Sequence, residues 1–423
     1  MAFGLLIDRR KLNKRNHVVD VFRSQGFLSK VRAREACGYS MDTLINVFDG
    51  LQEEGYILPS SPVAAEEPPA LPEAAPGRAA KQKRPKGRPA ELFRLNDERE
   101  IYLGSTFNQG AIYSVLVSFS GATLALRTDE LIGVADQAGF ESAFAGHLDA
   151  FLAENQARLP AVKRIGLALP GQLDAEKKIL KHYGLMPFIK DVDIGALVGS
   201  RLPNLPLIIR HNVAGMARVF LKDRALAQGY GRILLVSARA GAAHALIQDG
   251  KVVLDQGEMG HLRVAASTKR CECGRAGCLD SIFSARELRP LFPGMSGSDL
   301  SMALADEEAA GGSVLRSRLE PPYLAFCEAL LDLCAAFSPD LVLLSGELLA
   351  LLPDPAAWIW RWIGGLIDLG NPPAWFPGDM EYRPTGAEAA AIGLCYALIE
   401  EDWAWQADRA ESQAPDARTT AVL

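Results

Sequence analysis

The feature that most constrains the fold is a dense cluster of thiols near the middle of the chain. Cys271, Cys273 and Cys278 fall within eight residues, interleaved with glycines that allow a tight turn, and His261 stands ten residues before the first of them. Together they make a Cys₃His set, the closed tetrahedral donor set that holds structural Zn²⁺ and leaves no position for a catalytic water. The sequence therefore predicts a structural zinc site.

The alternatives are a disulfide or three unrelated thiols. Cys271 and Cys273 are separated by one residue, which suits a disulfide poorly, and the N-terminal residues do not read as a secretory signal. We therefore expect a reduced, cytoplasmic protein. The other cysteines lie among apolar residues and are expected to be small buried side chains: Cys37, Cys327, Cys334 and Cys395.

The residues around the thiol cluster resemble the signature of the ROK family, which contains bacterial sugar kinases and sugar-responsive repressors. The matching motifs are Glu-x-Gly-His at 258–261 and Cys-x-Cys-Gly-x-x-Gly-Cys-Leu-Asp at 271–280. In that family the histidine binds zinc and touches the sugar, and the glutamate hydrogen-bonds sugar hydroxyls. The resemblance implies these roles for His261 and Glu258. Asp280 stands where the family usually has a glutamate, and its shorter carboxylate is a further candidate for a sugar contact.

Composition describes a globular protein with room for more than one core. The chain has 423 residues, of which 49% are hydrophobic and 23% charged, enough for two or three domains. No run of eighteen apolar residues predicts a membrane span. The net charge of −6 excludes a protein that is basic all over, but it leaves room for a local basic segment.

The first 97 residues carry the pattern of a winged helix-turn-helix domain. Apolar spacing predicts an amphipathic helix over 11–25, and Ser29 and Ser40 are good N-caps for two more helices. Strands are predicted at 56–58 and 92–95. Three helices followed by a strand pair is the outline of a domain whose third helix enters the major groove of operator DNA. The alternative is a small helical dimerisation module.

The predicted reading helix is acidic, so its DNA contacts are limited to its start. No Lys or Arg lies between Tyr39 and Gly77, and the candidate contacts on this helix are uncharged: Ser40, Thr43 and Asn46. Phosphate neutralisation dominates nucleic-acid affinity, so it should come from two basic clusters, residues 9–15 before the first helix and the segment 81–89. The cations that we select there are Lys83, Arg84 and Lys86.

A Gly-Arg-Pro step at 87–89 resembles the wing of ROK repressors, which implies that Arg88 reaches a minor groove. Residues 59–80 are rich in Pro, Ala and Glu and are predicted to be a disordered insertion in the wing. The alternative for the basic segment is a solvated linker.

From residue 98 onward, repeated strand-then-helix units indicate an α/β protein, with a buried strand over 162–169 and an alanine-rich closing helix over 386–398. The family resemblance implies a two-lobed, actin-like or ribonuclease-H-like sugar-kinase fold. We expect a first lobe from 98–210 and 386–405, a second lobe with the zinc site from 211–385, and a flexible tail over 406–423.

A kinase of this fold needs a phosphate loop with an acidic metal partner, a second glycine-rich loop and a carboxylate base. No acidic residue lies between Glu100 and Asp129, and the second loop, 239–245, carries side chains where the family has glycines. At the base position the family's Asn-Asp is replaced by His211-Asn212. Since an amide cannot take up a proton near neutral pH, we predict a non-catalytic member in which both residues bind sugar.

The predicted function is a sugar-responsive, DNA-binding transcriptional regulator, acting as a repressor and forming a homodimer or higher homo-oligomer. One alternative is an ATP-dependent ROK sugar kinase that uses His211 as an atypical base. Another is a protein-interaction module whose basic segment binds an acidic partner.

Overall fold

The computed structural model describes residues 14–60, 91–108 and 110–412. The chain forms two compact units. The first, called here the N-terminal unit, comprises residues 1–101, 118–122 and 399–423; the second, called the body, comprises 102–117 and 123–398. Among the described helices, none is both long enough and apolar enough to cross a membrane.

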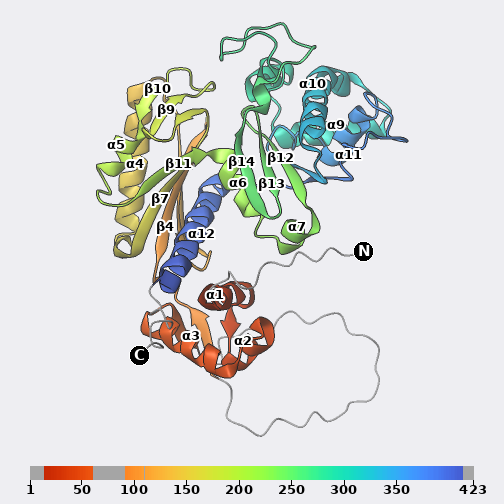
Figure 1. Cartoon of the computed structure of the whole chain (residues 1–423). Coiled ribbons are helices and arrows are strands. Elements are labelled where there is room, and N and C mark those ends of the chain that lie inside the picture. The colour runs from red at the N-terminus through yellow and green to blue at the C-terminus, as the bar shows by residue number, and fades with distance from the viewer. Residues whose placement is uncertain (1–13, 61–90, 109, 413–423) are drawn as a thin grey trace, which may run out of the picture. The chain divides into compact units, whose positions relative to one another are not determined.

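In its described residues the N-terminal unit contains three complete helices and a three-stranded antiparallel sheet (Figure 1). Its elements are α1 (Lys14–Gln25), β1 (Phe27–Leu28), α2 (Lys30–Cys37), α3 (Met41–Glu53), β2 (Ile57–Ser60) and β3 (Leu92–Leu95). The strand order is β1-β3-β2. Ser29 and Ser40 cap α2 and α3 through their hydroxyls, as predicted, and Gly38 ends α2 in the left-handed conformation.

The core of this unit is aromatic. The Phe48 ring on α3 lies 5.5 Å from that of Phe22 and 5.4 Å from that of Phe93, and all three side chains are buried. Fully burying one such ring contributes about 1.5–3 kcal/mol. A second cluster joins Tyr56 to Trp403, whose ring stacks on Phe119 at 5.4 Å. The chain's last helix therefore belongs partly to this unit.

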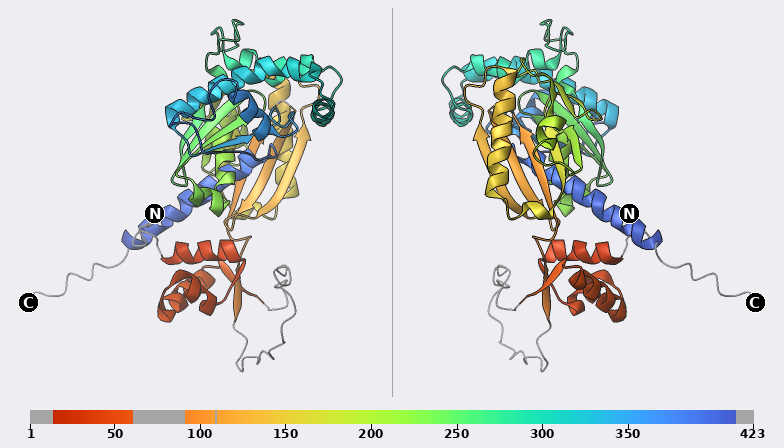
Figure 2. Two further views of the ribbon diagram at one scale, coloured as in Figure 1. Left: turned by 90° about the vertical axis from the view of Figure 1, so that its right-hand side faces the viewer. Right: turned by 90° about the vertical axis from the view of Figure 1, so that its left-hand side faces the viewer.

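The first lobe of the body is built on a five-stranded sheet in the order β11-β7-β4-β5-β6. The strands are β4 (Ile101–Phe107), β5 (Ala111–Ser118), β6 (Thr123–Glu130), β7 (Val162–Leu169) and β11 (Leu207–His211). Helix α4 (Gln137–Glu154) covers its outer face (Figure 2), where Phe140 packs 4.9 Å from Phe107. Helix α5 (Ile194–Gly199) and a small sheet, β8 (Gln172–Asp174), β9 (Ile179–His182) and β10 (Lys190–Asp193), complete the lobe.

The second lobe has its own five-stranded sheet, ordered β14-β13-β12-β15-β16. The strands are β12 (Arg232–Ala238), β13 (Ala242–Gln248), β14 (Lys251–Gly257), β15 (Leu341–Ser345) and β16 (Asp379–Tyr382). One face packs on α10 (Val314–Phe337) and α11 (Pro355–Ile363), whose Trp358 and Trp362 are buried in that core. The remaining helices are α7 (Arg224–Gly229), α8 (Ala285–Leu288) and α9 (Gly297–Ala309).

Two helices, α6 (Asn212–Phe220) and α12 (Ala389–Ser412), lie between the two sheets of the body (Figure 1). They approach closely at glycines: a Cβ on Gly215 would come within 2.0 Å of the Ala390 carbonyl oxygen, and one on Gly393 within 1.8 Å of the Gly215 oxygen. Only glycine permits this backbone approach. The packing fixes α6, and with it the two residues at its start, against α12.

Most predicted strands and helices are present, but the predicted end of the last helix was wrong. The sequence predicted a helix over 386–398 and a tail beyond 406, whereas α12 begins at Ala389 and continues to Ser412. The predicted end at Leu398 was too early because Trp403, five residues further along, is buried. Residues 413–423, like most of the predicted wing insertion, lie outside the described residues.

Candidate functional site

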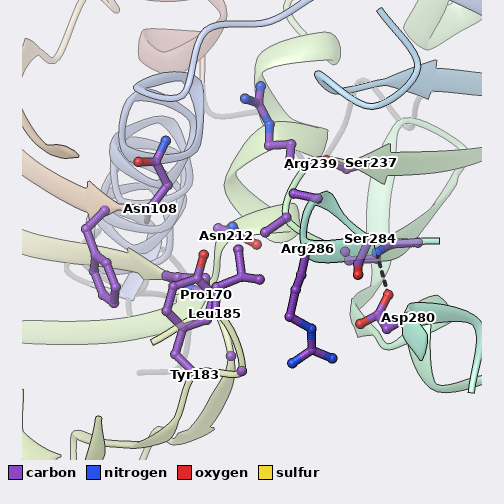
Figure 3. Close-up of a pocket in the computed structure, with 18 of the residues that line it drawn as sticks. Asn108, Pro170, Tyr183, Leu185, Asn212, Ser237, Arg239, Asp280, Ser284 and Arg286 are labelled. Atoms are coloured by element: carbon purple, nitrogen blue, oxygen red, sulfur yellow. Dashed lines mark hydrogen bonds between the residues drawn. The ribbon is translucent and has the colours of Figure 1, made fainter. Parts of the chain in front are cut away.

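A cavity of about 520 Å³ opens between the two lobes of the body (Figure 3). All five residues predicted to contact a sugar line it: His211, Asn212, Glu258, His261 and Asp280. They come from the start of α6, from the turn after β14, and from the turn that follows the thiol cluster. The fold thus brings together segments that lie up to 69 positions apart.

The His211 imidazole is held in one tautomer by the helix that it caps. Its Nδ1 accepts a hydrogen bond from the Val213 backbone N–H at 3.4 Å, so the proton of the neutral ring belongs on Nε2. That Nε2 lies 3.9 Å from Oε1 of Glu258, too far for a direct hydrogen bond. A ligand hydroxyl between them could accept from His211 and donate to Glu258. A nitrogen that already carries a proton cannot serve as a general base.

Asp280 is directed at the protein backbone more than at the cavity. Its Oδ1 accepts a hydrogen bond from the Ala242 N–H at 3.2 Å, drawn as the dashed line in Figure 3. Its carboxylate fits against two glycines: a Cβ on Gly241 would come within 2.6 Å of it and one on Gly260 within 2.2 Å. Burial raises the pKa of this carboxyl to about 6. Asp280 thus ties the turn after the thiol cluster to the turn between β12 and β13.

The predicted metal ligands are gathered in one place. The donor atoms of His261, Cys271, Cys273 and Cys278 all lie within 4.8 Å of one another. Cys273 Sγ is 3.6 Å from Cys278 Sγ, and Cys271 Sγ is 3.7 Å from His261 Nδ1. Ligands at Zn–N and Zn–S distances on the corners of a tetrahedron lie about 3.3–3.8 Å apart, so these two separations fit a tetrahedral ion. All seven cysteines are free thiols, and the four outside this cluster are buried, as predicted.

The turn between β12 and β13 is the segment for which the sequence resemblance implied a phosphate loop, and the Arg239 side chain lies across it. Arg239 donates to Glu347 Oε1 at 2.7 Å and to the Thr385 carbonyl at 2.6 Å. In the hairpin formed by β4 and β5, the Asn108 side-chain oxygen accepts hydrogen bonds from the Gly110 and Ala111 amides. These contacts leave neither segment with the open glycine backbone that phosphate binding uses.

Several cavity residues had not been predicted from sequence. They come from the small sheet of the first lobe and from the segment around α8: His182, Tyr183, Leu185, Arg286 and Arg289. Figure 3 shows Arg286 directed into the cavity from the second lobe, opposite Tyr183 and Leu185. No sequence motif marks these residues, although Arg286 follows the predicted cluster by only a few positions.

The predicted DNA contacts are only partly within the described residues. Ser40 and Asn46 are exposed on α3, while Ser40 Oγ accepts from the Thr43 amide at 3.3 Å and donates to the Thr43 hydroxyl at 3.0 Å. The cations chosen in the wing lie outside the described residues: Lys83, Arg84, Lys86 and Arg88. Sequence reasoning had overlooked Arg32 and Arg34, two exposed cations on the neighbouring helix α2.

A second polar cluster in the first lobe has the connectivity of a hydrolase triad. His147 Nε2 lies 2.9 Å from Ser114 Oγ, and its Nδ1 lies 2.7 Å from Asp129 Oδ2. Ser114 is fully buried and Ser105 Oγ lies 2.6 Å from its hydroxyl. A nucleophile needs access to its substrate, so we assign this cluster to packing of α4 on the sheet.

The model of the ROK family matches residues 136–352, just over half of the chain. The chain is 25% identical over 247 residues to the DNA-binding transcriptional repressor Mlc of Escherichia coli (strain K12), a match that covers 57% of this chain and 59% of Mlc. Less than two thirds of that relative is therefore matched.

Solved structures extend the likeness. A ROK family transcriptional regulator, described as a homologue of E. coli Mlc, superposes with a TM-score of 0.67 at 18% identity, covering 95% of this chain and 99% of that one. The ROK hexokinase from Thermus thermophilus gives a TM-score of 0.52 at 19% identity, covering 71% of this chain and 99% of its own. At these identities the likeness establishes the two-lobed sugar-kinase fold. By the family match and by this fold, the chain belongs to the ROK family.

Proposed function

We propose that the chain is a sugar-responsive transcriptional repressor whose kinase-like body binds a sugar without phosphorylating it. The observation that carries this proposal is the state of the base position at the start of α6. Asn212 offers an amide where a base is needed, and His211 presents a protonated Nε2 to the cavity while its Nδ1 is taken by Val213. Both side chains suit recognition of a hydroxyl.

The nucleotide side of the cavity supports the same conclusion. A phosphate group entering the turn after β12 would meet the Arg239 side chain, which is bonded to Glu347 and to the segment before α12. An arginine can bind phosphate, but this guanidinium already has partners. In the first hairpin, between Glu100 and Asp129, the sequence has no carboxylate to hold a magnesium ion.

The ligand that this cavity favours is a sugar or a sugar derivative. Glu258 can accept hydrogen bonds from sugar hydroxyls, Asn212 can both donate to them and accept from them, and His211 and His261 add two ring nitrogens. The cavity volume of about 520 Å³ falls within the range typical of small-molecule sites. Asp280 contributes by fixing the turn at Ala242.

We further propose that the Cys₃His cluster holds one structural Zn²⁺. Four ligands from the protein complete a tetrahedron, so the ion would supply stability and no reactive water. Its binding would hold His261 at the edge of the sugar cavity, as a ligand and a pocket residue at once. The same arrangement of thiols and histidine is typical of the ROK zinc motif.

The N-terminal unit is proposed to bind operator DNA as part of a homodimer or higher homo-oligomer. The acidic residues of α3 are partly neutralised within the unit, because Lys30 pairs with Asp49 at 3.2 Å and Arg15 with Glu54 at 2.6 Å. Ser40, Thr43 and Asn46 are then the polar groups for base edges, and the wing segment supplies positive charge. That Mlc is a DNA-binding transcriptional repressor supports this part of the proposal.

Two measurements on the purified full chain test the proposal. Selection from a random duplex pool should enrich one sequence, and a thermal-shift screen should find a sugar that raises the melting temperature. Incubation of that sugar with ATP and Mg²⁺ should yield no sugar phosphate. Phosphorylation that is lost in His211→Ala would instead establish the kinase alternative.

A further inference from the structure

We infer that Arg239 is a positioning residue that couples the cavity to α12, the helix shared by the body and the N-terminal unit. The inference rests on the proposed function and extends it to regulation. Arg239 directly follows β12 and lines the cavity together with Glu347. In Figure 3 its side chain points away from Asn212 and Asp280.

The guanidinium grips the segment that leads into α12. Its Nη2 donates to the Thr385 carbonyl at 2.6 Å, to the Thr385 hydroxyl at 2.8 Å and to the Gly386 carbonyl at 3.1 Å. The Gly386 carbonyl also accepts from the Ala389 amide at 3.3 Å, in the first turn of the helix. One side chain thus holds the segment just before α12 at two carbonyl groups.

Most hydrogen bonds of the Arg239 side chain go to Thr385 and Gly386. Arg239 is 14% exposed, and its other bond, from Nη1 to Glu347, is 2.7 Å long. Within the described residues its buried Nε has no hydrogen-bond partner. A buried donor left without a partner costs free energy, so a ligand group or water that reaches Nε would be favoured there.

The turn that carries Arg239 is bonded to the sugar-lining segments as well. Ala242 donates to Asp280, and the Ala240 carbonyl accepts from the Ala285 amide at 2.9 Å. A ligand that rearranges the residues around Asp280 therefore acts on the same turn as Arg239. Because Arg239 continues to Thr385 and Gly386, such a rearrangement is passed to the start of α12.

Helix α12 carries the effect out of the body. It is one helix from Ala389 to Ser412, and the boundary of the two units falls within it, between Leu398 and Ile399. Trp403, four residues further along, is buried against Phe119 in the N-terminal unit. A change in how α12 begins can therefore alter a helix that forms part of the core of the DNA-binding unit.

The test compares Arg239→Gln with a matched control, Arg383→Gln. Arg383 lies two residues before Thr385 and pairs with Asp223 at 2.7 Å and Glu381 at 2.9 Å, so it shares the segment but not the grip on the carbonyls. Hydrogen exchange of the amides of 386–398 is measured in the full chain, together with affinity for the duplex that the wild-type chain selects from a random pool.

We expect Arg239→Gln to speed exchange over 386–398 at least tenfold and to change DNA affinity at least fivefold. In Arg239→Lys, the exchange rate and the DNA affinity should both lie closer to those of the wild type than in Arg239→Gln. The melting temperature of each variant shows whether it remains folded. Arg383→Gln should change neither. Faster exchange with unchanged DNA affinity would show that Arg239 only stabilises its surroundings, and would overturn the inference. Unchanged exchange would overturn it as well. A wild-type chain that selects no duplex would overturn the proposed function itself.

Discussion

Asp280 Oδ1 and the backbone nitrogen of Ala242 lie 3.2 Å apart, which joins the turn after the thiol cluster to the turn between β12 and β13. The carboxylate has little space around it, because Gly241 and Gly260 close over it from two sides. The shorter aspartate at this position fits that confinement. This close packing makes the cavity wall around Asp280 sensitive to a small increase in the volume of a neighbouring side chain.

A methyl group at residue 260 should therefore destabilise the body. Gly260→Ala places a Cβ within 2.2 Å of the Asp280 carboxylate, and overpacking of this kind costs about 1–3 kcal/mol. The matched control is Gly146→Ala in the middle of α4, where nothing lies within 4 Å and alanine is the better helix former. Thermal unfolding should show a lower melting temperature for the first variant only. Equal melting temperatures would contradict the packing described for Asp280.

The thiol cluster should bind one Zn²⁺ per chain. Metal analysis of the purified chain is expected to find a stoichiometry of about one, and Cys273→Ser to reduce it strongly, since the closed tetrahedral site needs all four ligands. Cys37→Ser, a change at a thiol in the N-terminal unit, should keep the metal. Removal by a strong chelator should lower the melting temperature, and added Zn²⁺ should restore it. A wild-type chain free of metal would contradict the assignment.

The stability of the body should decrease as the pH is lowered, because His244 is buried as a neutral imidazole. Burial lowers the pKa of this imidazole from 6.5 to about 4, so the folded chain keeps it neutral over a range in which the unfolded chain is protonated. Stability from this source is complete above pH 6.5 and is lost as the pH falls toward 4. The full loss corresponds to about 3 kcal/mol.

The measurement is chemical denaturation at several pH values in wild type and His244→Gln. The difference between the two unfolding free energies isolates this group from others that titrate in the same range. It should shrink by about 3 kcal/mol between pH 7 and pH 4. A constant difference would show that His244 can be protonated in the folded chain.

The basic wing segment should dominate the electrostatics of DNA binding. Replacing Lys83, Arg84 and Lys86 with glutamine removes three charges, which should make the salt dependence of binding less steep by about 0.9 for each charge that contacts a phosphate. Two exposed lysines of the body, Lys177 and Lys251, serve as controls and should leave the slope unchanged. An unaltered slope in the wing variant would show that the segment is a solvated linker. Arg32 and Arg34 would then be the next cations to replace.

Local features of this fold could be read from the sequence, because local chemistry determines them. The caps at Ser29 and Ser40 and the buried strand at 162–169 are present as predicted. The Cys₃His cluster was predicted because its spacing within one short segment leaves few other arrangements. These are cases in which the sequence neighbours are also the structural neighbours.

Contacts between distant segments could not be predicted in this way. Arg239 and Thr385 are 146 positions apart, and no sequence motif predicts the contact between them. The same holds for His182 and Tyr183, which reach the cavity from a small sheet whose short strands have weak periodicity. The length of α12 depended on the burial of Trp403, which is a property of tertiary packing.

The central claim is that a sugar bound in the body changes DNA affinity without being consumed. The most direct measurement is the affinity of the full chain for its selected duplex, with and without the sugar found by thermal shift, in wild type and in Glu258→Gln. The account predicts that the sugar shifts the affinity of the wild type by tenfold or more. The variant should keep its metal and its DNA binding but lose the response. Equal affinity with and without sugar in the wild type, or an equal response in both chains, would contradict the account.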